Sequence, residues 1–150
     1  AHSAFLLNIG IETLPVRMKQ YCENALIVAK HFSASNKLLS VRYPGLENDP
    51  YYALAQKYLP KGTSGVITFS IKGGRDAAVR FMDSLKLASN VVHVADIRTC
   101  VLHPASATHR QLTDSQLEDA GIDAGMIRFS CGLEHVDDII ADIDQALLSV

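Results

Sequence analysis

The stretch SGVITFSIKGGRDAAVRFMDSLKLA, residues 64–88, decides the fold. In its first part small or polar residues alternate with the large apolar residues Ile67, Phe69 and Ile71, and this period of two predicts a β-strand. The following helix, over residues 75–88, has its apolar side chains on one face, at Ala78, Phe81, Met82 and Leu85. KGG at 72–74 lacks both complete phosphate-loop patterns, so we interpret it as the turn between strand and helix.

The remaining elements follow from the same reasoning on either side of this unit. Pro15 is tolerated only in a first helical turn, so a helix begins near Thr13. The predicted helices cover residues 14–32, 50–59, 75–88, 113–121 and 136–150, and the predicted strands cover 37–45, 64–71, 90–96, 100–104 and 125–132. Several consecutive strands lack a crossover helix, so the sequence predicts an α+β domain: a mixed or antiparallel sheet with helices packed on one face.

Length and composition restrict the function. The 150 residues suit a single domain, and the net charge of -2 with scattered basic residues excludes the footprint of a nucleic-acid binder. Apolar runs stay well short of the roughly 20 residues of a membrane span. The three cysteines form no CxxC pair, which indicates free thiols in a reducing compartment and predicts a cytoplasmic protein.

The stretch HPASATHRQL, residues 103–112, is rich in groups that carry chemistry. The spacing of His103 and His109 fits neither HExxH nor a Cys/His zinc pattern, so no metal site is expected. A GxSxG nucleophile motif is absent as well. The acidic residues from Asp137 to Asp144, Asp142 included, are interpreted as a solvated helix face near a helix N-terminus. No stretch of the chain contains a complete catalytic apparatus.

Arg128 and His93 are the more informative residues. In the strand containing MIRFSCG, Ile127, Phe129 and Cys131 face the core, so Arg128 points the other way. A guanidinium held on a rigid strand can bind a carboxylate through two hydrogen bonds, whereas the alternative is an exposed or internally paired arginine. The same alternation in NVVHVAD places His93 on a strand, opposite to Val92 and Val94.

HPASATHRQL and GMIRFSCGLEHVDDIIADIDQAL together resemble the C-terminal end of the pyridoxal-phosphate enzymes of cysteine and methionine metabolism. GIETLPVRMKQYCENALIVAKHF, VRYPGLENDPYYALAQKYLPKG and FSIKGGRDAAVRFMDSLKLASN extend the resemblance over essentially the whole chain. Within that family the motifs are most similar to those of the O-acetylhomoserine sulfhydrylases.

The resemblance implies a transferase that replaces the γ-acetoxy group of O-acetylhomoserine with sulfide to give homocysteine. It also implies that Arg128 binds the substrate α-carboxylate and that Thr108 is a weaker contact, while His103 and His109 shape the loop through local hydrogen bonds. The family usually has Asn or Ser where this chain has His93, and Gly where it has Ala95. His93 is therefore expected to hold the carboxylate in their place, to obstruct it, or to change the substrate preference.

The resemblance places the cofactor, pyridoxal phosphate, in an N-terminal domain that residues 1–150 do not include. The family's Schiff-base lysine, ring-stacking aromatic residue and phosphate-binding loop belong to that domain, and Lys72 does not match the lysine's surroundings. We therefore expect residues 1–150 to be one C-terminal substrate-binding domain, with 1–12 as an inter-domain helix segment, and to be inactive alone.

Two further expectations concern partners. The apolar stretch AFLLNIGI, residues 4–11, is expected to be the face that meets the larger domain, and the protein is expected to be a homo-oligomer. The alternative to an enzyme fragment is a stand-alone α+β ligand-binding or interaction module that has kept the fold and lost the chemistry.

Overall fold

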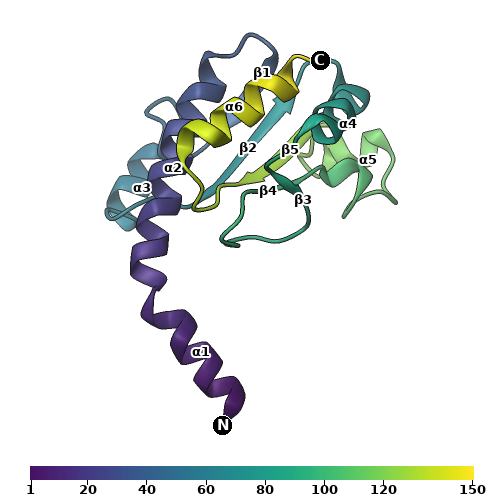
Figure 1. Ribbon diagram of the computed structural model, residues 1–150. Helices are drawn as coiled ribbons and strands as arrows, with labels where there is room; N and C mark the ends of the chain where they lie inside the picture. The colour runs from purple at the N-terminus through teal and green to yellow at the C-terminus, as the bar shows by residue number, and fades with distance from the viewer.

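A computed structural model describes residues 1–150. The elements occur in the predicted order, beginning with a helix in segment 1–12 and interrupted by one short 3-10 turn (Figure 1): α1 (His2–Glu12), α2 (Leu14–Ala34), β1 (Leu38–Arg42), α3 (Tyr52–Tyr58), β2 (Val66–Ile71), α4 (Gly74–Ser84), β3 (Ser89–Asn90), β4 (Cys100–Leu102), η1 (Pro104–Ser106), α5 (Asp114–Asp119), β5 (Met126–Ser130) and α6 (Val136–Leu147).

The strands form one mixed sheet in the order β1-β2-β5-β4-β3, in which only the β3–β4 pair is parallel. The strand β5 lies in the middle, between β2 and β4. Arg128 therefore has a cross-strand partner on each side, Thr68 of β2 and Leu102 of β4. Residues directly opposite in antiparallel strands project from the same face, so these three side chains share one face of the sheet.

The helices α2, α4 and α6 cover the other face, as predicted, and the core lies between them and the sheet (Figure 1). Phe69 of β2 lies at the centre of the core, with its ring centroid 4.2 Å from that of Phe32 on α2 and 5.8 Å from that of Phe81 on α4. The alternation that predicted the strand is confirmed, because Ile67, Phe69 and Ile71 are all buried.

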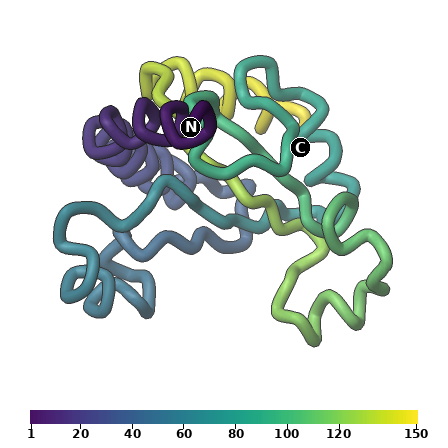
Figure 2. Tube along the Cα trace, turned by 90° about the horizontal axis from the view of Figure 1, so that it is seen from below, coloured from purple at the N-terminus to yellow at the C-terminus, as the bar shows by residue number.

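The uncovered face of the sheet carries Arg128. Figure 2 shows the segments around α3 (blue) and α5 (green) projecting away from the three large helices, near opposite ends of the sheet. The α5 segment begins with the predicted capping box between Thr113 and Gln116 and ends at Gly121 in the left-handed conformation.

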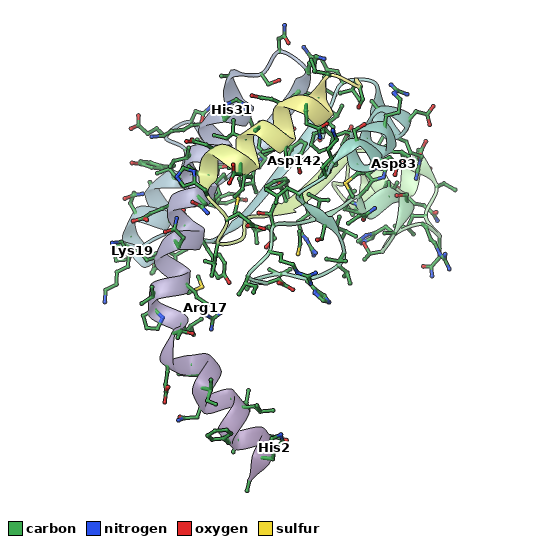
Figure 3. All side chains as sticks on the ribbon, in the orientation of Figure 1. His2, Arg17, Lys19, His31, Asp83 and Asp142 are labelled. Carbon is green, nitrogen blue, oxygen red and sulfur yellow. The ribbon has the colours of Figure 1, made fainter.

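The two largest differences from the predicted boundaries lie at residues 90–96 and 75–88. The strand expected over residues 90–96 ends at Asn90, and residues 91–99 form a loop between β3 and β4, which we call the β3–β4 loop. The helix expected to reach residue 88 ends at Ser84. Beyond it, the carboxylate of Asp142 on α6 (labelled in Figure 3) accepts the backbone N–H groups of Lys86 at 2.8 Å, Leu87 at 3.0 Å and Ala88 at 2.9 Å.

Asp142 also corrects the interpretation of the acidic residues as a solvated face. Its side chain is buried, and Gln145 donates a further hydrogen bond of 3.1 Å to the same carboxylate. Asp144, two residues later, is exposed and lies 2.6 Å from His31 of α2. Only part of the run is therefore solvated, and Asp142 fastens the end of α4 to α6.

The first helix projects away from the rest of the molecule (Figures 1 and 3). None of its residues is buried, and its large apolar side chains are all exposed: Phe5, Leu6, Leu7, Ile9 and Ile11. Arg17 fixes the joint with α2 by donating to the carbonyl oxygen of Gly10 at 2.6 Å and to the hydroxyl of Thr13 at 3.2 Å. None of the helices is both long and apolar enough for a membrane span.

Candidate functional site

Arg128 is half-buried in the middle of β5. Its guanidinium reaches the β3–β4 loop, where Nη2 donates to the carbonyl oxygen of Val92 at 2.7 Å and to that of His93 at 3.3 Å. None of the ion pairs in the structure includes Arg128. The side chain is thus held on a rigid strand by neutral acceptors and carries an uncompensated positive charge.

The β3–β4 loop is fastened to the domain at several points. Tyr21 of α2 donates from its hydroxyl to the carbonyl oxygen of Ala95 at 3.4 Å. Glu134 accepts from the backbone N–H of Thr99 at 2.7 Å and from its hydroxyl at 2.9 Å. Any side chain at position 132 would collide with the backbone of residues 98 and 99, so Gly132 allows the close approach. The loop is therefore positioned by contacts from α2 and from the segment after β5.

Within this loop, Asp96 organises the side chains. It accepts from His93 Nδ1 at 3.1 Å and from Arg98, whose backbone N–H lies at 3.1 Å and whose Nη2 lies at 3.3 Å. The hydrogen bonds of Arg98, followed by that of His93, hold the pKa of the Asp96 carboxyl far below its usual range. Asp96 is consequently a permanent anion at neutral pH.

His93 lies in this loop and not on a strand, which corrects the prediction. The alternation of Val92 and Val94 arises in a loop segment where both side chains are exposed, so its period does not report a buried face. The His93 imidazole is 58% exposed. His93 and Arg128 are nevertheless brought together, since the guanidinium contacts the backbone of His93 itself.

His103 and Thr108 lie in the segment that follows β4. His103 is buried and bonds through Nδ1 to the Ser106 hydroxyl at 2.8 Å and through Nε2 to the carbonyl oxygen of Ala124 at 2.8 Å. Burial lowers the pKa of His103. Thr108 is exposed, and its hydroxyl lies 2.9 Å from Nδ1 of His109. The two histidines shape this segment by local hydrogen bonds, as expected from the resemblance.

A hollow of about 390 Å³ separates this segment from the start of the β3–β4 loop. Thr108 lines the hollow together with two residues that adjoin Arg128: Val92, whose carbonyl oxygen accepts from the guanidinium, and Leu102, its cross-strand partner. Thr108 therefore lines this hollow directly, whereas Arg128 adjoins it through Val92 and Leu102 and contacts the backbone of His93.

Two larger hollows, of about 510 and 530 Å³, lie between α2 and the segment around α3. They are lined by residues such as Cys22, Leu26 and Gln56 and include none of the predicted site residues. We place the candidate site at Arg128, because the chemistry required for binding a carboxylate lies there.

The lysines of residues 1–150 do not fit the imine-forming role in a pyridoxal-phosphate enzyme. Lys72 is exposed and donates to the carbonyl oxygen of Asn36 at 2.5 Å. Lys37 is half-buried but donates to the carbonyl oxygens of Leu147 and Val150 at 2.5 and 2.7 Å, and the other lysines are exposed. An imine-forming lysine needs an environment that favours its neutral amine, and these positions do not provide one.

Asp96 and Glu134 are the site residues that sequence reasoning missed. Asp96 stands two residues before Arg98, a spacing at which an aspartate side chain binds a nearby backbone N–H, and this signal could have been recognised. Glu134 and Thr99 are far apart in the chain, so no local pattern indicates their contact.

A helix-covered mixed sheet with a charged arginine on its open face defines an α+β domain. The chain belongs to the Cys/Met metabolism PLP-dependent enzyme family, whose profile matches residues 1–148. It is 46% identical over 143 residues to homocysteine synthase of Schizosaccharomyces pombe, a match that covers 95% of this chain and 33% of that protein. It is 44% identical over 142 residues to the O-acetyl-L-homoserine sulfhydrylase of Leptospira meyeri, covering 94% and 32%.

A solved structure gives the same result for the fold. The crystal structure of a protein assigned as an O-acetylhomoserine (thiol)-lyase from Campylobacter jejuni matches with a TM-score of 0.90 and 38% identity. The match covers 97% of this chain and 35% of that one, which carries a pyridoxyl-lysine phosphate at its position 205. The α+β fold and the family are thereby established, and this chain spans about a third of the length of its relatives.

Proposed function

We propose that this chain is the substrate-binding part of a pyridoxal-phosphate-dependent O-acetylhomoserine sulfhydrylase. The reaction breaks the bond between the γ-carbon and the acetoxy oxygen, forms a bond from sulfide to the same carbon, and yields homocysteine and acetate. The names of relatives at 46% and 44% identity support this assignment. The cofactor supplies electron withdrawal when bound, and residues outside 1–150 hold it.

One observation carries the proposal for the site. The guanidinium of Arg128 lies on the open face of the sheet, without an acidic partner and next to a hollow. Such a cation binds and orients the α-carboxylate of an amino acid through charge-assisted hydrogen bonds. His93, whose carbonyl oxygen contacts Arg128, and Thr108, which lines the same hollow as Val92, assist as secondary contacts.

The proposal extends to the surroundings of the enzyme. Amino-acid substrate and sulfide are the partners, and neither nucleic acid nor a membrane is involved. The exposed apolar side chains of α1 would be covered by the cofactor-binding part or by another subunit of a homo-oligomer. A cytoplasmic location suits the free thiols of Cys22, Cys100 and Cys131.

Titration of the chain with O-acetyl-L-homoserine, followed by NMR chemical shifts, tests the site. The expected shifts occur at residues 92–94, 102, 108 and 128, and the α-carboxamide of the same compound gives none. Arg128→Gln removes the positive charge and is expected to weaken binding roughly tenfold to a hundredfold, since a hydrogen bond to a charged group contributes about 1.5–3 kcal/mol.

Arg80→Gln is the matched control, because Arg80 is an exposed arginine of α4 that contacts Ser149 away from the site. This variant should bind like the wild type. Equal affinity of the wild type and Arg128→Gln, or equal binding of the acid and its amide, would refute the role of Arg128.

A second candidate, a stand-alone binding module, is favoured by the closure of the hydrophobic core within these residues. The natural reading frame separates the two. A frame that extends about 280 residues upstream, the length of roughly two further domains, supports the enzyme. A frame that starts near Ala1 supports the module.

A further inference from the structure

The pairing of His93 with Asp96 fixes which imidazole nitrogen carries a proton. Asp96 is ionised at neutral pH and can only accept, so Nδ1 of His93, at 3.1 Å, must be the donor. With Nδ1 protonated, Nε2 has a free lone pair in the neutral ring. Nε2 becomes a donor only when the imidazole takes up a second proton.

This arrangement conflicts with carboxylate binding by neutral His93. A carboxylate oxygen is an acceptor, and the lone pair of Nε2 repels it. Asn or Ser, the residues that the resemblance places at this position, can donate to a carboxylate without a proton from solvent. His93 can do so with Nε2 only as the imidazolium, as long as Asp96 holds Nδ1.

The charges around His93 are those of four other groups. Asp96 and Arg98 lie in the same loop and form an ion pair, with Nη2 of Arg98 3.3 Å from the carboxylate. Arg128 approaches from β5 and contacts the His93 carbonyl oxygen at 3.3 Å. Glu134, from the segment after β5, accepts from Thr99.

Two further titratable side chains adjoin the loop. The hydroxyl of Tyr21 reaches the Ala95 carbonyl oxygen from α2, and Cys100 begins β4 directly after the loop. Burial raises the pKa of the Cys100 thiol, so it is neutral at ordinary pH.

The balance of these charges couples proton binding to carboxylate binding. Asp96 and Arg98 form an ion pair, whereas the guanidinium of Arg128, which contacts the His93 carbonyl oxygen, has no acidic partner to offset its charge. A substrate carboxylate on Arg128 would cancel that charge and also offer an acceptor to the protonated ring. Because coupling between two binding events is reciprocal, the proton and the carboxylate each strengthen binding of the other.

We propose that His93 binds the substrate α-carboxylate only as an imidazolium, with Asp96 as the positioning residue, so that substrate binding takes up one proton. This inference rests on the proposed function, because it requires Arg128 to hold the carboxylate. It assigns His93 a pH-dependent role in binding the substrate α-carboxylate, and it gives Asp96 the role of holding the proton on Nδ1 of His93. Substrate is then bound more tightly in mildly acidic solution than in alkaline solution.

The dissociation constant for O-acetyl-L-homoserine, measured by NMR titration of the 150-residue chain at pH 5.5 and pH 8, tests this inference. The substrate α-carboxylate is ionised at both values. The wild type is expected to bind about fivefold to tenfold more tightly at pH 5.5. His93→Asn, with a donor that needs no proton, is expected to bind with the same affinity at both.

His135→Asn is the matched control, because His135 also lies near an aspartate, with Nδ1 3.7 Å from Asp137, at the start of α6. It should retain the wild-type pH dependence. Asp96→Asn provides a readout that a merely structural role would not change. The ¹⁵N shifts of the His93 ring report the protonated nitrogen, and in this variant the neutral ring is expected to lose its fixed Nδ1–H form.

Four outcomes separate the two proposals. If wild type and His93→Asn show the same pH dependence, or if the wild type shows none while Arg128→Gln still weakens binding, the role of His93 fails and the proposed function stands. An unchanged His93 ring in Asp96→Asn refutes the positioning role. If Arg128→Gln binds as the wild type does at both pH values, both proposals fail.

Discussion

Tyr21 on α2 and Ala95 in the β3–β4 loop are joined by a hydrogen bond of 3.4 Å, from the tyrosine hydroxyl to the alanine carbonyl oxygen. Ala95 lies in the left-handed region, with φ at 59°. An alanine there is strained, because its Cβ approaches the following carbonyl oxygen. The hydrogen bond from Tyr21 thus helps to hold the β3–β4 loop in a backbone conformation that glycine adopts freely.

Ala95→Gly should therefore stabilise the protein. Relief of the left-handed strain is worth about 1–2 kcal/mol, and the greater freedom of glycine in the unfolded chain offsets about 0.4–1 kcal/mol of it. We expect a net gain of about 0.5–1 kcal/mol, measured by urea denaturation with circular dichroism, since the chain contains no tryptophan. The matched control is Ala53→Gly in α3, an exposed helical position, which should lose about 1 kcal/mol. A loss of stability in Ala95→Gly would contradict the assigned backbone conformation.

Asp142→Asn should destabilise the fold by about 1–3 kcal/mol. The carboxylate accepts from the backbone N–H groups of residues 86–88, and the amide of asparagine leaves at least one of these part-buried hydrogen bonds unformed. Asp144→Asn is the control on the same helix. Its carboxylate is 56% exposed and pairs only with His31, so a change below about 1 kcal/mol is expected. Equal urea midpoints for the two variants would show that the contacts of Asp142 are not stabilising.

The elements whose packing follows from local periodicity could be predicted from the sequence. Phe69 of β2 and Phe81 of α4 are buried as their spacing indicated, because a strand or helix with one apolar face can only bury that face. The orientation of Arg128 followed from the same argument. Alternation along β5 alone places Arg128 on the face of the sheet away from the buried residues of that strand, without reference to any contact distant in sequence.

The β3–β4 loop could not be predicted, because contacts distant in sequence determine it. Tyr21 holds the loop from α2, and Glu134 holds it from the segment after β5. The period-two pattern within residues 90–96 contains no information about either contact. Asp142 was misjudged for the same reason. Its neighbours in α6 suggest a solvated face, and only the end of α4 explains its burial.

His103 predicts a pH dependence of stability. Burial, with a smaller contribution from Arg75, lowers its pKa, while the hydrogen bond to Ala124 opposes the shift. The ordinary pKa of histidine is about 6.5. Below this pH, His103 binds a proton in the unfolded chain more readily than in the folded chain. The free energy of unfolding therefore falls as the pH drops from about 6.5.

Urea midpoints at pH 7.5 and 5.5 measure this effect. His103→Gln is expected to be less stable at pH 7.5 and to lose less on acidification than the wild type. His2→Gln, at an exposed position on α1, should keep the wild-type difference. The low pKa of Asp96 keeps that carboxyl ionised throughout this range, so it adds nothing to the difference. An unchanged difference in His103→Gln would mean that His103 is not held neutral.

The lysines predict how this chain responds to pyridoxal phosphate. An imine forms through an unprotonated amine, and exposed lysines are almost entirely protonated at neutral pH. Lys37, the half-buried one, directs its ammonium to the carbonyl oxygens of Leu147 and Val150. Borohydride reduction after addition of one equivalent of the cofactor at pH 7.5 should therefore give only scattered, substoichiometric adducts by mass spectrometry. A sample of the chain that has been unfolded in acid and then neutralised should form these adducts to a similar low extent, because the fold activates none of the lysines. A stoichiometric adduct at a single lysine, lost on unfolding, would show that this chain holds the cofactor itself.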